Sequence, residues 1–532
     1  MQSLEWYDSF YGPLYPLDLK DYLYNQRQCK QVKSLVKLAA CKIIKDATVT
    51  SRAISMLPTE LFVPLMQEAI ENGRDRAIDV LVSRWPFRSL GLKKLAPPPF
   101  QSLNLLYDQN LLKNTVKKSL QYTTSIVHSF FESLKKKYPT KLRFLDLSGH
   151  PTAEVIALYL ATHCMLVHNE AQQKSMISMY NDTQQKISQH CSEASGQEYQ
   201  RFEVDQTFPD DTYIVKLDAF VTSDETLAEM CKALRVSSFP ESRLKICLER
   251  LDATCLGVEL VKQLLGEVKP EQLQGLRLKY NHLTCDNFRE LASILKTYTN
   301  LTALDLSCNK INIFYSDSTS TIMADMFQNM EFLIRLDLSN NRIKSKVSRL
   351  LTKLKRPLLY LRLCGCGLTK NDIEYLSKSH HASALQEVDL SENSLGQSIQ
   401  HLVVFLQNMK LTLHVLELEE SVLSDNHMRE ISQILPSLAQ LLYLNLSGNS
   451  MCLSTLSTVT EKVSELADLQ IFRVSFSREC YSHTLDAEQL EGEAKETLKK
   501  LLTRIILSVK LSKQLVLTLP NLIMSELEME SI

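Results

Sequence analysis

The sequence is poor in glycine and lacks the short motifs that many enzymes carry. Only 13 of its 532 residues are glycine, which is few for loops that cradle phosphate groups. It contains no G-x-x-x-x-G-K-[ST], no G-x-S-x-G, no H-E-x-x-H and no glycine pattern of a dinucleotide-binding fold. We therefore expect a protein that is not an enzyme, with no catalytic residues, no bound metal and no cofactor.

Other features are also scarce, and each scarcity excludes a class of protein. Lys plus Arg number 60 and Asp plus Glu 61, so global charge does not favour nucleic-acid binding. No stretch of about 18 apolar residues could cross a membrane, and the first residues lack the basic start and apolar run of a signal peptide. Thirteen cysteines is an odd number, and none form a C-x-x-C pair. A reducing compartment is therefore expected, the cytoplasm first and the nucleus second.

What the chain does contain is one eleven-residue phrase that recurs seven times. The first copy, from Leu273 to Leu283, fits L-x-x-L-x-L-x-x-N-x-L at every fixed position. The seven copies open at Leu273, Leu301, Leu333, Leu358, Leu385, Leu413 and Leu441, which is 28 residues per repeat on average. This phrase and period are those of a leucine-rich repeat.

The pattern inside each repeat predicts one strand and one helix. Leu276 and Leu278 are two apart, so they share one side of a short strand. Asn281 follows where the chain must turn, and such asparagines bond backbone groups of their own and adjacent turns as a ladder. The rest of each unit returns as an amphipathic helix. We therefore predict an α/β leucine-rich-repeat solenoid, a horseshoe with parallel strands on its concave face and helices on its convex face.

The flanks of the array are less regular. We expect an N-terminal helical cap at 1–100, degenerate repeats at 101–240 with a polar insertion at 170–212, regular repeats at 241–480, and a C-terminal helical cap and tail at 481–532. Early strands are predicted at Phe144, Ile214 and Leu244. The strand at Leu469, Phe472 and Val474 is predicted to be the last rung.

The N-terminal cap resembles a known family. The segment Leu57–Leu65 reads LPTELFVPL, and Ser83–Phe87 reads SRWPF. Upstream, Leu35–Ala39 reads LVKLA, and Ile43–Asp46 reads IIKD. These segments resemble the entry motifs of the PRAME (preferentially expressed antigen in melanoma) family. We interpret Trp85 and Phe87 as core residues of the cap.

Two segments near the other end refine the resemblance. Ser379–Leu385 and Cys480–Tyr481 are similar to the leucine-rich repeat-containing protein 14 subgroup of that family. The resemblance covers nearly the whole chain, apart from residues 1–30 and the insertion at 170–212.

The resemblance implies a substrate receptor for a cullin-2 RING ubiquitin ligase, joined through elongins B and C. An elongin-C box needs a large aliphatic residue, a small residue four on and an aliphatic residue four further on, as one helical stripe in an apolar groove. Leu35, Ala39 and Ile43 have this spacing, with Ala39 where many such boxes carry Cys. A cullin-2 box needs an aliphatic-proline pair that opens a helix. The residues that fit it are Leu57, Pro58, Leu61 and Leu65.

A simpler interpretation stays open for the same helices. A solenoid needs amphipathic helices to cover the open core of its first repeat, and the chain would then be a non-catalytic scaffold that sequesters and negatively regulates a signalling or transcription protein. Exposure of Leu35 distinguishes the two: if Leu35, Ala39 and Ile43 are buried in the chain's own core, the receptor interpretation weakens.

The target protein, which the sequence does not identify, is expected on the concave face. Repeat positions three and five point there, and they include several acids and two tyrosines. The residues predicted to bind the target are Asp305, Asp337, Tyr360, Arg362, Asp389, Glu417 and Tyr443. Exposed aromatic residues within an acidic stripe suit protein recognition. The alternative is that Leu-Asp-Leu-Ser is common in such repeats, so that the acid has only a structural role.

Overall fold

The computed structural model describes residues 14–15, 34–98, 109–135, 140–164, 174, 212–478 and 514–518. The chain divides into two compact units, Met1–Asn281 (unit 1) and His282–Ile532 (unit 2). The segment of the expected C-terminal helical cap, most of the insertion at 170–212 and most of residues 1–30 lie outside the described residues, and the predicted domain boundaries stay predictions.

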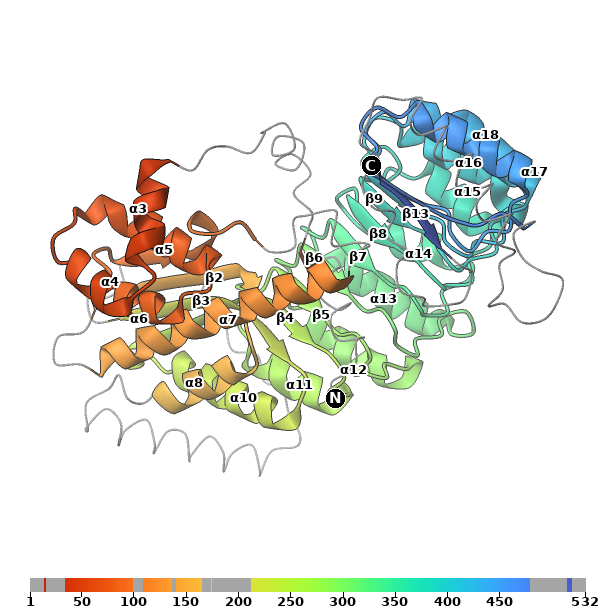
Figure 1. The fold of residues 1–532 in the computed structure, drawn as a ribbon. Helices are drawn as coiled ribbons and strands as arrows, with labels where there is room; N and C mark the ends of the chain where they lie inside the picture. Colours follow the sequence, from red (N-terminus) through yellow and green to blue (C-terminus); the bar gives the residue numbers. More distant parts are fainter. Residues whose placement is uncertain are drawn as a thin grey trace, which may run out of the picture. The chain divides into compact units, whose positions relative to one another are not determined.

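Unit 1 opens with a group of short helices (Figure 1). These are α3 (Leu35–Ile43), α4 (Ala47–Ala53), the 3-10 helix η1 (Thr59–Leu61), α5 (Phe62–Glu71) and α6 (Asp75–Ser83). Local capping starts the first two, because the Ser34 side chain accepts from the amide of Lys37 and the Asp46 side chain accepts from the amides of Thr48 and Val49.

Strands and helices then alternate through the rest of unit 1. They are β1 (Ser89–Gly91), η2 (Leu92–Lys94), α7 (Gln109–Leu134), β2 (Phe144–Pro151), α8 (Val155–His163), β3 (Tyr213–Val221), α10 (Asp224–Ser238), β4 (Leu244–Ala253), α11 (Val258–Glu267) and β5 (Gly275–Arg277). Strands β1 to β5 pair in chain order, and every pair is parallel. The three predicted early strands are therefore confirmed as β2, β3 and β4.

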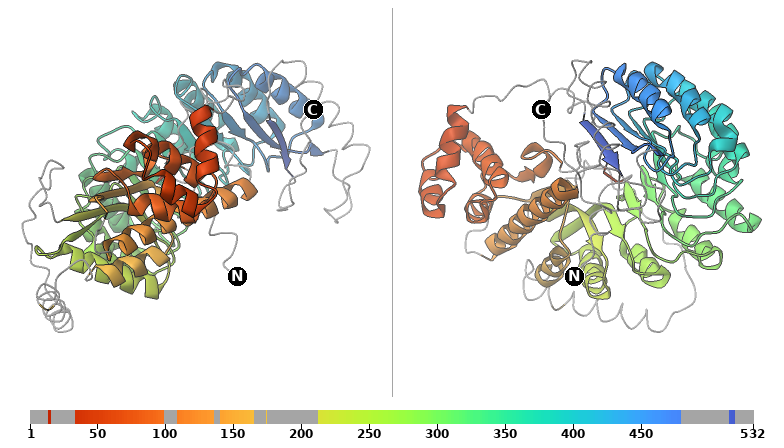
Figure 2. Two further views of the ribbon diagram at one scale, coloured as in Figure 1. Left: turned by 60° about the vertical axis from the view of Figure 1, so that its left-hand side comes forward. Right: turned by 45° about the vertical axis from the view of Figure 1, so that its right-hand side comes forward.

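Unit 2 repeats the alternation with shorter strands. Its helices are α12 (Cys285–Leu295), α13 (Asp317–Asn329), α14 (Val347–Leu351), α15 (Lys370–Lys378), η4 (Gly396–Ser398), α16 (Ile399–Asn408), α17 (Asp425–Ile434), η5 (Leu435–Ser437) and α18 (Leu453–Ser464). Its strands are β6 (Ala303–Asp305), β7 (Arg335–Asp337), β8 (Tyr360–Arg362), β9 (Glu387–Asp389), β10 (Val415–Glu417), β11 (Tyr443–Asn445), β12 (Ile471–Ser475) and β13 (Gln514–Thr518). The strands lie side by side and the helices cover one side of them (Figure 2).

The register of unit 2 follows the repeat phrase. Asp337 is paired with Asp305 on one side and with Arg362 on the other, so that equal repeat positions lie in rows across the strands. The leucines at positions four and six, such as Leu304 and Leu306, are 0% exposed and form the core between strands and helices. The fold class is a leucine-rich-repeat solenoid, as predicted.

The predicted asparagine ladder joins successive turns. The side-chain nitrogen of Asn341 donates to the carbonyl oxygen of Leu306 in the preceding turn at 2.9 Å, and to that of Leu338 in its own turn at 3.0 Å. Cys366 takes the ladder place in the next repeat, and its thiol donates to the Leu338 carbonyl at 3.3 Å. The ladder therefore continues through a weaker donor, as expected.

A left-handed residue stands directly before the ladder position in each regular repeat. Its φ values are 57° at Tyr280, 53° at Cys308, 56° at Asn340, 61° at Gly365, 56° at Glu392, 49° at Glu420 and 71° at Gly448. Two of these seven residues are glycine, although glycine is the residue that adopts such a φ without steric cost. The chain therefore forms these left-handed turns mostly with residues other than glycine.

Two strands depart from expectation. The strand β12, predicted to be the last rung, pairs with β13 on its far side. The strand β1 extends unit 1 before the first predicted strand. Strands β13 and β1 were therefore missed, because neither lies within a copy of the repeat phrase.

Candidate protein-binding surfaces

Helix α3 presents apolar residues outward. Leu35 is 85% exposed and Ala39 is also exposed, while Ile43 is half-buried. The opposite face of the helix buries Ala40, and Ile44, the residue after its last turn, is buried too. The three candidate elongin-binding residues are therefore not part of the chain's own core.

The exposed apolar surface of this helical group is wider than the sequence interpretation proposed. Val36, Leu38, Val49 and Met56 are all exposed as well. A signal was present in the sequence, because Leu35 and Val36 are consecutive and therefore point about 100° apart around a helix. Exposed apolar patches are typical of protein-interaction sites, so these side chains are candidates for one.

A polar clamp fixes the orientation of α3 on α5. The carboxylate of Glu68, which is buried, lies 3.3 Å from the ammonium of Lys37 and accepts from the thiol of Cys41 at 2.6 Å. Lys37 also pairs with Glu71 at 3.0 Å, and this hydrogen bond is the main reason that the pKa of Lys37 is raised. Because these polar groups occupy the inner side of α3, its apolar stripe points to solvent.

The candidate cullin-binding residues are only partly accessible. Pro58 is exposed at the start of η1, and Leu57 and Leu61 are half-buried. The assignment of Leu65 is wrong as a contact residue, because its side chain is 2% exposed. Leu65 lies on the inner face of α5 with Met66 and Ala69, where it packs into the core of the helical group.

The aromatic pair after α6 has two different environments. Trp85 is buried, packs edge-on against Phe62 with ring centroids 6.2 Å apart, and donates from its indole nitrogen to the Ser89 carbonyl at 2.9 Å. Trp85 is thus a core residue, as predicted. Phe87 is 39% exposed, so the same prediction is wrong for Phe87.

The strand face of unit 2, formed by the first and third residues of β6 to β12, carries the predicted target-binding residues. Tyr360 and Tyr443 were expected to be exposed there, and this is wrong: each is 1% exposed. The guanidinium of Arg335, at the same position of the neighbouring strand, lies 4.3 Å from the centroid of the Tyr360 ring. A large side chain at this position covers its neighbour, because adjacent strands are only about 4.8 Å apart.

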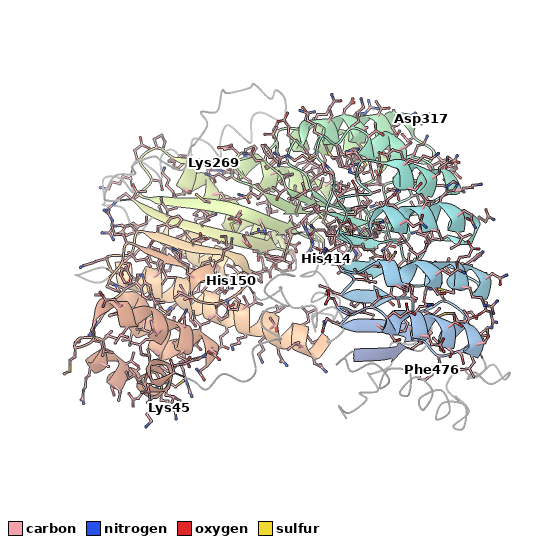
Figure 3. The ribbon with its side chains drawn as sticks, turned by 90° about the horizontal axis from the view of Figure 1, so that it is seen from above. Lys45, His150, Lys269, Asp317, His414 and Phe476 are labelled. Carbon is pink, nitrogen blue, oxygen red and sulfur yellow. The ribbon has the colours of Figure 1, made fainter. Side chains whose placement is uncertain are left out.

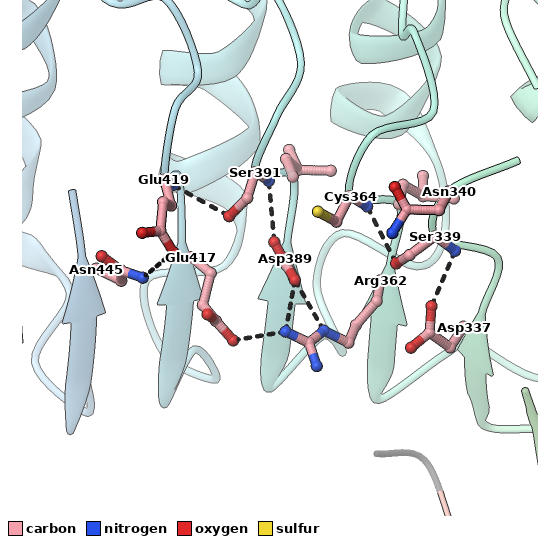
Figure 4. Close-up of polar contacts among 12 residues, drawn as sticks. Asp337, Ser339, Asn340, Arg362, Cys364, Asp389, Ser391, Glu417, Glu419 and Asn445 are labelled. Carbon is pink, nitrogen blue, oxygen red and sulfur yellow. Dashed lines mark hydrogen bonds and ion pairs between the residues drawn. The ribbon is translucent and has the colours of Figure 1, made fainter. Parts of the chain in front are cut away.

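The acidic stripe is paired internally. The Arg362 guanidinium lies 2.6 Å from Asp389 and 3.0 Å from Glu417, which are on the next two strands (Figure 4). Arg335 pairs in the same way with Glu387 at 3.1 Å. These partners are 27 to 55 residues apart in sequence, but the repeat period places them on adjacent or next-adjacent rungs. The stripe is therefore a mixed network rather than an open acidic patch.

Several of the acids also end their own strands. The carboxylate of Asp337 accepts from the amide of Ser339 at 2.9 Å, and Asp305 and Asp389 accept from Ser307 and Ser391 at the same distance. An aspartate that bonds the amide two residues on closes a turn. The structural role that the sequence left open for Leu-Asp-Leu-Ser is thus present.

Asp337→Asn is expected to stabilise the protein at neutral pH, with a gain that fades in acid. Burial, and after it the charge of Asp305, raises the pKa of Asp337 from 3.8 to about 6. The folded state therefore binds this proton more tightly than the unfolded state, and Asp337 lowers stability as pH rises between about 4 and about 6. An asparagine can still accept from Ser339 and carries no charge, so we expect a gain of roughly 1–3 kcal/mol at pH 7.5.

Denaturant unfolding at pH 4 and pH 7.5, followed by circular dichroism, measures this difference. Asp389→Asn is the matched control: it makes the same chemical change in a carboxylate that pairs with Arg362, and it should lower the unfolding free energy at pH 7.5. If Asp337→Asn lowers it as well, the charge of Asp337 is stabilising and the argument from burial is wrong.

Neither a metal centre nor a membrane span is evident in the described ranges. Nowhere in them do three His, Cys, Asp or Glu side chains gather closely enough to hold a metal ion. None of the helices described is both long enough and apolar enough to cross a membrane.

Two buried histidines form hydrogen bonds within the fold. His150 in β2 (Figure 3) bonds the Tyr122 hydroxyl at 2.9 Å, and burial lowers its pKa to about 3. His381, which precedes β9, accepts from the Leu358 amide at 3.1 Å.

Comparison with known proteins identifies the family. Residues 32–114 match the PRAME N-terminal domain and residues 218–519 match the PRAME C-terminal domain. The chain is 25% identical to leucine-rich repeat-containing protein 14 of Xenopus laevis over 481 residues, which cover 85% of this chain and 89% of that protein. The human protein of the same name is 25% identical over 464 residues, 84% and 88% of the two chains. PRAME family member 20 of Homo sapiens is 23% identical over 454 residues, 84% and 86%. The chain belongs to the PRAME family, as its N-terminal motifs predicted.

Proposed function

We propose that this chain is the substrate-recognition subunit of a cullin-2 RING ubiquitin ligase, in which α3 binds elongin C and the strand face of unit 2 binds a target protein. The observation that carries the proposal is the exposed stripe of α3. Leu35 is 85% exposed on a helix that is capped at its start and clamped to α5. A rigid helix with an exposed apolar stripe is the form in which helices bind apolar grooves.

The segment from Leu57 to Leu61 supplies the cullin-2 contact in this proposal. Pro58 is exposed and Leu57 and Leu61 are half-buried, so the contact rests on these three residues without Leu65. Helix α4 (Ala47–Ala53) separates these residues from α3 in the chain, so the elongin and cullin surfaces are on different elements. Ubiquitin transfer would be carried out by other subunits, with this chain as a non-catalytic adaptor in the cytoplasm or the nucleus.

A second candidate function is a binding scaffold that sequesters a signalling or transcription protein. The observation that favours it is the burial of Leu65, Phe62 and Trp85, which shows that much of the helical group forms its own core. In that case the strand face would still bind a target, but no ligase subunit would be recruited.

Reconstitution from purified components tests the ligase proposal directly. The full chain is mixed with elongins B and C, then with cullin-2, and each mixture is resolved by size-exclusion chromatography. We expect the chain to co-elute with elongins B and C, and cullin-2 to join that complex. A folded chain that elutes alone from both mixtures would contradict the proposal and leave the scaffold function.

A further inference from the structure

The strand face of unit 1 is occupied by two residues from a distant part of the chain. Leu14 and Tyr15 lie against β4 and β5, where Leu14 is 1% and Tyr15 is 8% exposed. The Arg250 side chain donates from Nε to the Leu14 carbonyl oxygen at 2.8 Å. Its guanidinium also lies 5.7 Å from the centroid of the Tyr15 ring. One arginine of β4 thus holds both residues of the pair.

The pocket that receives the pair is on the side of the sheet away from the repeat core. Arg250 pairs with Gly275 across the two strands, whereas the next residues along, Leu251 and Leu276, are 0% exposed in the core. Successive side chains of a strand point to opposite faces. Arg250 and Gly275 therefore form the floor of the pocket on the strand face, the surface with which repeat proteins of this kind bind partners.

Gly275 makes room for the pair. A Cβ atom at this position would be 3.3 Å from Cγ of Leu14 and 3.1 Å from Cγ of Arg250. The same repeat position carries a side chain in every following strand: Ala303, Arg335, Tyr360, Glu387, Val415, Tyr443 and Ile471. The pocket therefore depends on the one repeat that lacks a side chain there.

The walls of the pocket suit one apolar and one phenolic side chain. Leu112 and Val116, four residues apart on α7, are buried in one apolar cluster with Leu14 and Tyr15. The charged groups around Tyr15 are Asp218, Arg250, Asp252 and Arg277. Burial raises the pKa of the Tyr15 hydroxyl well above its usual value, and Asp218 adds to this rise. The phenol is therefore held as a neutral hydrogen-bond donor.

One acceptor in the pocket is unused. Asp218, which is 1% exposed, accepts at Oδ2 from the Gly149 amide at 2.8 Å and lies 3.4 Å from Arg250. Its Oδ1 is buried and has no hydrogen-bond partner among the residues that the structure describes. A buried acceptor without a donor is costly in a finished core, but it is useful in a site that accepts a donor from a bound peptide.

We propose that this pocket is a recognition site for an apolar residue followed by a tyrosine in a peptide, that Leu14 and Tyr15 fill it in cis, and that a partner protein binds this face by displacing them. Another peptide could supply the contacts described here, because they use one backbone carbonyl, one aliphatic side chain and one aromatic ring. The inference does not depend on the ligase function, since it concerns only unit 1 and a partner peptide.

Binding of a labelled peptide to the full chain tests the proposal. The probe is a synthetic peptide with the sequence of residues 10–19, and its control carries Asp in place of the leucine and tyrosine of the pair. Three chains are compared by fluorescence polarisation: wild type, a vacated double variant with Leu14→Ala and Tyr15→Ala, and the vacated variant with Gly275→Leu added. We expect at least tenfold tighter binding to the vacated chain than to the other two, and no binding of the control peptide.

Two results with the vacated chain would overturn the proposal. A vacated chain that keeps the wild-type melting temperature but does not bind the probe would mean that the pair is a fixed part of the fold. Equal binding to the vacated and Gly275→Leu chains would place the peptide elsewhere. If the alanine variant fails to fold, Tyr15→Cys in the wild-type chain supplies the test, because mass spectrometry can follow alkylation at that one position. Full protection of Cys at position 15 even with excess probe would overturn the exchange, and probe-dependent labelling would support it.

Discussion

Leu306→Asp is expected to unfold the repeats on both sides of β6. Leu306 is 0% exposed, and its carbonyl oxygen accepts from two ladder side chains, Asn309 and Asn341, each at 2.9 Å. A carboxylate there is buried among leucines without a partner, and the aliphatic contacts are lost as well. Together these changes cost about 4 kcal/mol or more, a large part of the roughly 5–15 kcal/mol that stabilises a typical domain.

The chain offers a matched control for this variant. Leu411 lies just before β10 and is 68% exposed, so Leu411→Asp makes the same chemical change at the surface of the same unit. Its melting curve should follow that of the wild type, whereas Leu306→Asp should lose helical signal at lower temperature. Hydrogen exchange should then show faster exchange of backbone amides in the repeats next to β6 and unchanged exchange in distant repeats, because each repeat contacts only its neighbours. A Leu306→Asp chain that melts like the control would mean that the assigned register is wrong.

The repeat register could be predicted from the sequence because it depends on positions that the core dictates. Leu276, Leu304 and Leu336 must face inward in every copy, since a shift of one residue would send the whole set to solvent. The ladder could be predicted for the same reason: each turn needs a side chain that donates to backbone carbonyl groups, and asparagine fills this role in most copies. Such local requirements repeat with the period, so seven weak signals support one another.

The burial and ion pairing of the side chains on the strand face could not be predicted in the same way. The repeat period correctly predicts that Asp389, Glu417 and Arg362 lie in rows, but the charge at each position does not show which of these side chains pair with one another. Whether Arg362 points to solvent or reaches across two strands depends on side-chain conformation and on the size of its neighbours. The exposure predicted for Tyr360 is wrong for the same reason, because Arg335 on the neighbouring strand covers its ring. Position in a repeat fixes the direction of a side chain, but burial is set by the adjacent rungs.

The contact of Leu14 and Tyr15 with β4 was beyond sequence reasoning for a different reason. Arg250 and Leu14 are 236 residues apart, and no period or motif relates them. The one available signal was Gly275, which stands where every later strand carries a side chain, and a missing side chain alone does not say what fills the space. In the helical group, by contrast, the stripe of Leu35 and Ala39 followed from helical spacing, and the structure leaves both residues exposed.

Leu35→Ala combined with Ala39→Asp is expected to abolish recovery of elongins B and C in a pull-down. If Leu35 fills an apolar pocket on elongin C, its truncation removes a hot-spot contact of about 2–4 kcal/mol, or roughly 30- to 1,000-fold in affinity. The aspartate adds a charge that the apolar groove cannot solvate. Because Leu35 is 85% exposed in the free chain, the melting temperature should stay unchanged, and a loss of binding cannot be attributed to unfolding.

Two further variants make this test specific. Leu158 lies on α8 and its side chain is 53% exposed. Leu158→Ala should therefore leave elongin recovery intact. Leu57→Ser combined with Pro58→Ala should spare elongin and lose cullin-2, since these residues begin η1 rather than α3. Binding of a target to the strand face should survive both double variants while ubiquitination of that target stops. If Leu35→Ala with Ala39→Asp recovers elongin as well as the wild type does, the exposed stripe of α3 is not the docking site, and the helices from Leu35 to Ser83 serve as the lid of the solenoid.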